Sequence, residues 1–166
     1  FKVRAGQVIV ATGSMEQPSV FRNNDLPGIM LGSAAQRLMR HYGVKPGNRA
    51  VVVAANADGY GVGLDLLDAG VELAGILDLR ATPPEDARAA AVRAKGVRIL
   101  TRHAPWEAFK GRNGAIAGLS AARIIGHGKC EPADEKLDCD LLCVSVGYAP
   151  VAHLLHHAGA KIGYHR

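Results

Sequence analysis

The middle of the chain alternates between apolar runs and a segment with helical spacing. Ala50–Ala55 is a run of small apolar residues that predicts a buried strand, and Glu72–Asp78 predicts a second one. Tyr60–Ala69, between them, has the spacing of a helix. A strand, a helix and a strand within about thirty residues predict a right-handed crossover that joins two parallel strands.

Signals before this unit predict one more helix. Ser33 and Gln36 have the spacing of a capping box, in which two side chains satisfy the first free N–H groups of a helix. Gly43 is well placed to end that helix, because glycine readily adopts the left-handed conformation found after helices.

The segment after the crossover predicts another helix and another strand. Pro83 and Pro84 precede a helical pattern at Glu85–Lys95, and proline is favoured in the first turn of a helix. Val97–Thr101 then predicts a third parallel strand. We therefore expect residues 48–103 to form a Rossmann-like core, a parallel sheet flanked by helices.

Short apolar runs separated by glycines fill residues 104–126 and predict an antiparallel β meander. We expect Trp106 and Phe109 to lie in its core. The complete chain, residues 1–166, is expected to be a single α/β domain cut from a larger chain.

Two further apolar runs lie near the ends of the chain. Gln7–Thr12 reads as a buried strand that ends in a glycine turn, and Leu141–Val146 reads as another. We expect residues 1–14 and 139–150 to be connecting strands. Val151–Ala158 predicts a short helix that follows them.

Charge and composition exclude several classes of protein. The formal net charge is +5, but the basic residues are scattered and no aromatic residues interleave with them, so no nucleic-acid partner is expected. No apolar run approaches the roughly 20 residues that a membrane span needs. Three cysteines without paired spacing favour neither a disulfide framework nor a zinc site, which fits a cytoplasmic setting.

The crossover is where a dinucleotide fingerprint, G-x-G-x-x-G, is expected. Laid on the end of the first strand, its three positions fall on Asn56, Asp58 and Gly61. The first two glycines of such a motif let the backbone turn tightly and approach the pyrophosphate, and the third lets helix and strand pack closely. Because only Gly61 is a glycine here, the fold can be kept while the ligand site has decayed.

The end of the second strand carries the other half of such a site. An acidic residue about twenty positions after the fingerprint normally binds the ribose hydroxyls, and Asp78 stands there. A carboxylate at this place favours NAD over NADP, whereas Arg80 is able to accept a 2′-phosphate. These residues therefore leave the binding of NAD open, and because of Arg80 the choice between NAD and NADP stays open too.

Asp58 has two expected roles in this turn. Aspartate is among the best N-cap residues, so its carboxylate can satisfy the free N–H groups at the start of the helix. The same charge would repel a pyrophosphate that normally binds there. We therefore predict that Asp58 caps the helix and hinders dinucleotide binding.

Longer motifs give the chain a family resemblance. Val10-Ala11-Thr12-Gly13-Ser14 resembles the turn that closes the first dinucleotide domain of the pyridine nucleotide-disulfide oxidoreductase superfamily, and residues 139–150 resemble its second counterpart. In that superfamily a second Rossmann domain is inserted between these two segments. Residues 21–31 and 55–60 more narrowly resemble the alpha subunits of heterotetrameric sarcosine oxidases, and opine-oxidase-type subunits less closely.

This resemblance implies a domain of a large complex that oxidises a secondary amine. Flavin, as FAD or FMN, would lie in partner chains, and NAD would be carried by the alpha subunit. Its partners would be the rest of its own chain and other oxidoreductase subunits. The isolated domain would be inactive, with no catalytic residue of its own. Two other functions stay open, a degenerate scaffold for subunit interaction and an NAD(P)H-binding domain that feeds a flavin.

Three histidines form the remaining candidate cluster. His153, His156 and His157 have helical spacing, but a metal site needs further ligands and a supporting second layer of hydrogen bonds. Solvent-exposed histidines on a helix are the simpler interpretation, and no metal site is expected.

Overall fold

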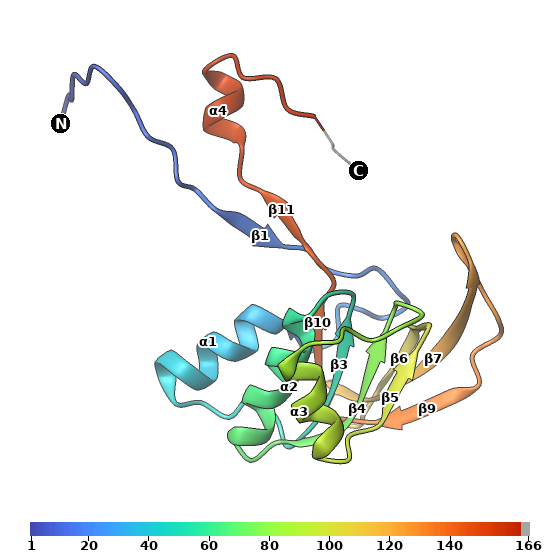
Figure 1. Cartoon of the computed structure of the whole chain (residues 1–166). Coiled ribbons are helices and arrows are strands. Elements are labelled where there is room, and N and C mark those ends of the chain that lie inside the picture. Colours follow the sequence, from blue (N-terminus) through green and yellow to red (C-terminus); the bar gives the residue numbers. More distant parts are fainter. Residues whose placement is uncertain (164–166) are drawn as a thin grey trace.

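The structure, a computed structural model, describes residues 1–163 and is built on a parallel sheet of five strands (Figure 1). The strand order is β2-β10-β3-β4-β5, so the last of these strands in the sequence is inserted between the first two. Their bounds are β2 (Ile29–Leu31), β3 (Arg49–Ala54), β4 (Glu72–Asp78), β5 (Ile99–Thr101) and β10 (Leu141–Ser145).

Three helices cover one face of this sheet (Figure 1). They are α1 (Gly32–Tyr42), α2 (Asp58–Asp68) and α3 (Ala87–Ala94). Val52 and Ile76 point from the strands into this layer and pack with Leu66 of α2, all three fully buried. The crossover predicted from the sequence is confirmed, because α2 joins the parallel strands β3 and β4.

Antiparallel strands cover the opposite face. They are β6 (His103–Lys110), β7 (Ile116–Gly126), β9 (Glu135–Asp138) and the short β8 (Lys129–Cys130). Val51 and Val53, the neighbours of Val52 along β3, pack on this side with Leu119 of β7. Both faces of β3 are therefore buried, which explains its unbroken apolar run. The predicted class, a parallel sheet with helices and an antiparallel meander, is confirmed.

One prediction for the meander is wrong. Trp106 and Phe109 do not lie in the core, since they are 50% and 36% exposed. Between them on β6, Ala108 is fully buried. Side chains alternate between the two faces of a strand, and a bulge between residues 105 and 107 shifts the register, so both aromatic rings reach the outer surface.

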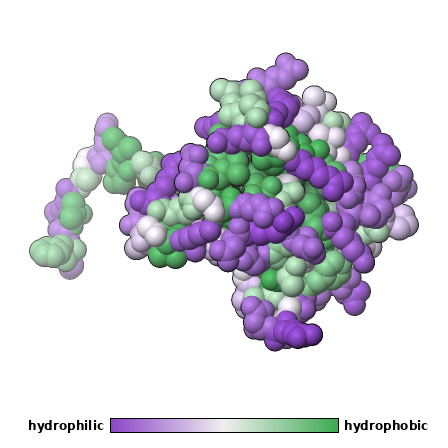
Figure 2. Space-filling model, turned by 90° about the horizontal axis from the view of Figure 1, so that it is seen from below, coloured by the Kyte–Doolittle hydropathy of each residue, from purple (hydrophilic) through white to green (hydrophobic). Residues whose placement is uncertain are grey.

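Two connecting segments leave the carboxyl edge of the parallel sheet side by side (Figure 1). β1 (Ser14–Glu16) pairs antiparallel with β11 (Tyr148–Pro150), and the short helix α4 (His153–His157) follows. We call residues 1–16 and 148–163 the arm. Seen from below, its amino-terminal end stands clear of the rest of the molecule, with hydrophobic and hydrophilic residues both exposed (Figure 2).

The strand predicted at Gln7–Thr12 is wrong. The pairing begins only at Ser14, and Ile9 is 93% exposed. Residues 7–12 precede the paired strands, and no described element of the chain packs over Val8 or Ile9.

The two predicted helix starts also differ from the structure. α1 begins at Gly32 without a side-chain cap, so the capping box of Ser33 and Gln36 does not form. The Ser33 N–H instead donates to the Glu16 carboxylate at 2.8 Å, while Gly43 ends the helix in the left-handed conformation as predicted.

α3 begins at Ala87, after both prolines, rather than at Glu85. Asp86 is its N-cap and accepts a hydrogen bond from the Ala89 N–H at 2.8 Å. Among residues 1–163, no helix is long and apolar enough to cross a membrane.

Candidate functional site

The turn between β3 and α2 holds two residues predicted to face a dinucleotide. Asn56 Oδ1 accepts a hydrogen bond from the Asp58 backbone N–H at 3.0 Å. The Asp58 carboxylate makes no cap hydrogen bond, so its predicted capping role is wrong. It accepts instead from Arg88 Nη1 of α3 at 2.8 Å. The start of α2 thus receives a side-chain acceptor from Asn56, two residues before the one expected.

Gly59, and not Gly61, lets α2 approach β3. A Cβ atom on Gly59 would lie 2.5 Å from the Cβ of Ala54, far inside contact distance. A Cβ on Gly61 would meet the Arg88 side chain at 3.6 Å, which is ordinary contact. The packing role predicted for Gly61 is therefore wrong. Placing the third fingerprint position on Gly59 moves the other two to Ala54 and Asn56.

Asp78 ends β4, and its carboxylate is fully buried. The Tyr60 hydroxyl donates to Oδ2 at 2.7 Å, and the Arg80 backbone N–H donates to Oδ1 at 2.9 Å. The Arg80 guanidinium adds two more hydrogen bonds, from Nε to Oδ1 at 2.9 Å and from Nη2 to Oδ2 at 2.8 Å. Both oxygens therefore already hold two donors each.

Arg80 also links the two halves of the predicted site. Its Nη2 donates to the backbone carbonyl of Asn56 at 3.3 Å, so the guanidinium lies between the end of β4 and the turn before α2. Ribose hydroxyls would have to displace these hydrogen bonds to reach Asp78. We call Tyr60, Asp78, Arg80 and the Asn56 carbonyl the crossover network.

The donors of this network keep their protons at neutral pH. Burial, and then the hydrogen bond to Asp78, raise the pKa of the Tyr60 hydroxyl well above its ordinary value. The hydrogen bond to Asp78 likewise raises the pKa of Arg80. The network is thus suited to holding the backbone in shape, and not to transferring a proton.

The five predicted residues divide into two groups. Asn56, Asp78 and Arg80 come together in the crossover network, whereas Asp58 and Gly61 face outward toward Arg88. This outer side is a groove of about 490 Å³, and its lining includes Gln36, Arg40, Asp65, Asp68 and Tyr148. For all five residues, binding of a dinucleotide stays a prediction.

Tyr60 is the member of the crossover network that the sequence did not indicate. It lies in the first turn of α2, and the Asp78 that it contacts ends the adjacent strand β4. A hydroxyl-bearing aromatic at the start of a crossover helix, followed by an acid at the end of the next strand, is the signal that would have indicated this contact.

The buried thiols offer no reactive nucleophile. Burial raises the pKa of both Cys139 and Cys143 to about 12, so both stay protonated at neutral pH. Within residues 1–163, no group of three or more histidine, cysteine, aspartate or glutamate side chains is arranged to hold a metal ion.

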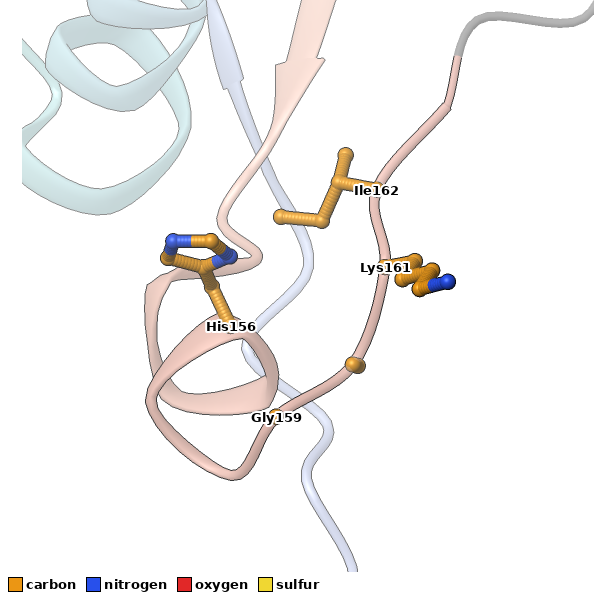
Figure 3. Close-up of a pocket in the computed structure, with 5 residues that line it drawn as sticks. His156, Gly159, Lys161 and Ile162 are labelled. Carbon is orange, nitrogen blue, oxygen red and sulfur yellow. The ribbon is translucent and has the colours of Figure 1, made fainter.

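A separate pocket of about 590 Å³ lies at α4 (Figure 3). It is lined by His156, Gly159, Ala160, Lys161 and Ile162. Ile162 points back toward the strands of the arm, and Lys161 points away (Figure 3). All five lining residues belong to one short stretch of the arm, so the pocket is a fold of that segment.

Comparison with known sequences identifies relatives along almost the whole chain. The chain is 35% identical over 160 residues to sarcosine oxidase subunit alpha of Corynebacterium sp. (strain P-1). The match covers 96% of this chain and 16% of that relative. The same subunit of Rhizobium meliloti (strain 1021) is 32% identical over 97% of this chain, which spans 15% of that relative. No family model matches the chain.

Solved structures share the fold. Thioredoxin reductase of T. acidophilum superposes with a TM-score of 0.67 at 14% identity, over 92% of this chain and 47% of that one. An FAD-dependent pyridine nucleotide-disulphide oxidoreductase from Desulfovibrio vulgaris superposes with a TM-score of 0.62 at 19% identity, over 92% of this chain and 38% of that one. Over nearly its whole length the chain is therefore homologous to a segment of sarcosine oxidase alpha subunits, with the fold of the pyridine nucleotide-disulfide oxidoreductases.

Proposed function

We propose that this chain is a nucleotide-binding-type domain in the alpha subunit of a flavin-dependent, multisubunit amine oxidoreductase that acts on sarcosine or a similar amine. The homology to sarcosine oxidase alpha subunits over 96% of the chain supports this proposal. The chain spans about a sixth of those relatives. Flavin and NAD are therefore assigned to the intact complex, and the domain contributes structure to it.

The proposal predicts that the domain alone does not oxidise an amine. The pKa of the Tyr60 hydroxyl is raised above its ordinary value, and burial keeps the Cys139 and Cys143 thiols protonated, so none of these groups is suited to act as an acid, a base or a nucleophile at neutral pH. The chain incubated with sarcosine and oxygen is expected to form no hydrogen peroxide and to carry no flavin absorbance. The matched control is the full-length alpha subunit assembled with its partner chains, which is expected to form peroxide. Peroxide from the isolated domain would contradict the proposal.

A second candidate, a scaffold whose dinucleotide site is closed, is favoured by one observation. Both oxygens of Asp78 are occupied by Tyr60 and Arg80, so this carboxylate offers a ribose no free acceptor. The wild-type chain is expected to bind neither NAD nor NADP with micromolar affinity when titrated by calorimetry. Such binding of NAD would instead support the NAD(P)H-binding alternative.

A variant pair sharpens this test. Arg80→Ser removes the guanidinium from Asp78, and we expect NAD binding to appear or to tighten by about tenfold, which corresponds to about 1.4 kcal/mol. Arg98→Ser is the control, because Arg98 makes an ion pair with Glu135 away from the crossover. Equal affinities in the two variants would show that Arg80 does not close the site.

A further inference from the structure

Glu16 is an exception within the arm. Most arm residues are exposed, but Glu16 is only 8% exposed. Its Oε2 accepts the Ser33 N–H of α1 at 2.8 Å. The first N–H groups of a helix lack partners in the helix and carry partial positive charge, so a carboxylate is well placed there. Glu16 therefore fastens β1 to the start of α1.

Gly32 makes this close approach possible. A Cβ atom on Gly32 would lie 3.3 Å from Glu16 Oε1 and 2.8 Å from Cγ2 of Val62 on α2. Any other residue at this position would push against the carboxylate and against α2 together. The start of α1 is thus shaped to receive the Glu16 side chain.

Tyr148 is the partner of Glu16 across the ribbon. The two residues are paired in the β1–β11 register, so their side chains share one face of the arm. Tyr148 lines the outer groove together with Asp58 and Arg88. Burial, and then the charges of Glu16 and Asp58, raise the pKa of its hydroxyl. The same cross-strand pair therefore reaches α1 through Glu16 and α2 through Tyr148.

Two polar atoms are buried without a hydrogen-bond partner where the arm joins the domain. They are Glu16 Oε1 and the Ser145 hydroxyl oxygen. Both lie beside Gly32, since its Cβ would also be 3.3 Å from the Ser145 Cβ. An apolar side chain would fill this place without the cost of burying unpaired polar atoms. A carboxylate here serves to bind the helix start.

We propose that Glu16 and Tyr148 form a latch that fixes the angle between the arm and the domain. The latch closes on the starts of α1 and α2, two of the three described helices that begin at the carboxyl edge of the parallel sheet. The consequence for a larger protein rests on the proposed function: the latch would set the orientation of this domain within an alpha subunit. The angle between the arm and the domain can be measured on this chain alone, whatever larger protein it belongs to.

Distance measurements between spin labels test the latch directly. One label is placed by Lys95→Cys after α3 and the other by Leu154→Cys in α4, in a Cys130→Ser background; Cys139 and Cys143 are buried. We expect a narrow distance distribution with the latch intact and at least a twofold broader one in Glu16→Ala. Glu85→Ala, at an exposed glutamate, is the matched control and should leave the width unchanged. An unchanged width in Glu16→Ala would overturn the proposal.

Hydrogen exchange separates a latch from a general loss of stability. In Glu16→Ala, the amides of Ser33 and Gln17 should exchange at least tenfold faster, while that of Val52 in β3 stays within twofold. Equal acceleration of all three would mean that Glu16 only stabilises the domain, which would overturn the latch. Glu16→Gln keeps the shape of the side chain and is measured in the same way if Glu16→Ala does not fold.

Tyr148→Phe tests the second half of the latch. Removing the Tyr148 hydroxyl is expected to broaden the distribution of distances between the spin labels less than Glu16→Ala does, because Tyr148 is half-exposed. Tyr42→Phe, at an exposed tyrosine of α1, is the control. Broadening equal to that of the control would overturn the role of Tyr148. All these readouts come from the chain itself, so they stand or fail independently of amine oxidation.

Discussion

The first turns of α2 present two faces that use the same chemistry with different results. On the inner face, Tyr60 and Gly59 are buried against β3 and β4, and Asp78 pairs with Arg80 at 2.8 Å. On the outer face, Asp58 pairs with an arginine at the same distance of 2.8 Å. The inner carboxylate is 0% exposed, whereas that of Asp58 is 49% exposed.

This difference teaches that distance alone does not set the weight of an ion pair. A buried carboxylate has lost its water, so each of its hydrogen bonds is needed to compensate that loss. An exposed pair exchanges its partner for water at almost no cost, and such pairs contribute about 0–1 kcal/mol. We therefore expect substitutions on the inner face to destabilise the domain and those on the outer face to be nearly neutral.

The largest expected effect is at Asp78. Asp78→Ala leaves the Arg80 guanidinium and the Tyr60 hydroxyl without their acceptor and is expected to lower the free energy of unfolding by about 3 kcal/mol. Urea unfolding followed by circular dichroism measures the change. Asp58→Ala is the matched control and should cost less than about 1 kcal/mol. Equal losses would show that burial does not distinguish the two pairs.

A smaller loss is expected at Gly59. Gly59→Ala would force its Cβ against Ala54, so α2 must shift away from β3, at a cost of about 2 kcal/mol. The melting temperature of the variant gives the result. A double variant, Gly59→Ala with Ala54→Gly, removes the contact of 2.5 Å but leaves that of 3.1 Å to the Cα of residue 54, so it is expected to recover part of the loss. If the double variant recovers no stability, the contact with the Ala54 side chain is not the cause of the loss.

Tyr60→Phe should cost about 1.5 kcal/mol, since it removes one hydrogen bond to a charged group and little volume. The variant also separates the effect of pH. Because the pKa of Tyr60 is raised above its ordinary value near 10, its contribution is present below pH 10 and is lost as pH rises further. Unfolding in urea between pH 9 and 11 should show a steeper decline for the wild type than for the variant. Parallel pH curves would contradict this assignment.

The smallest effect is expected at Gly61, and its sign is reversed. Gly61→Ala adds a Cβ that meets only the Arg88 side chain at ordinary distance. Alanine is the better helix former, so the domain should gain about 0.5 kcal/mol. A gain in melting temperature would confirm that neither close packing nor a special backbone conformation requires a glycine at position 61. A loss as large as that of Gly59→Ala would restore the packing role first predicted for it.

The sequence was most informative where both faces of a strand are buried. Glu72–Asp78 was predicted with the bounds that β4 has in the structure, because its apolar run is covered by helices on one side and by the meander on the other. The run around Val8 and Ile9 looks equally apolar but lies in the arm, where neither residue is covered. Hydrophobicity alone does not reveal whether a run has a neighbour to bury it.

The candidate site was predictable in its parts but not in its connections. The sequence indicates Asp78 and Arg80 by their place at the end of the second strand, about twenty residues after the fingerprint. Only the fold shows that the Arg80 guanidinium turns back onto the Asp78 carboxylate. The fingerprint was placed two residues too late at its third position because Ala54 stands where a glycine would mark the turn. The close approach of Gly59 requires a small residue at position 54, and Ala54 is small enough to meet that need.

The position of β10 in the sheet has a consequence for how the chain reaches this fold. β10 lies between β2 and β3, and more than a hundred residues separate it from β2 along the chain. During synthesis, β2 and one edge of β3 must therefore wait without their partner until Leu141–Ser145 have left the ribosome. Contacts between such distant segments fold slowly, and unpaired apolar edges invite aggregation in the meantime. β10 is the last-made strand of the five-stranded sheet and completes it, so an interrupted synthesis yields a chain that cannot finish its own core.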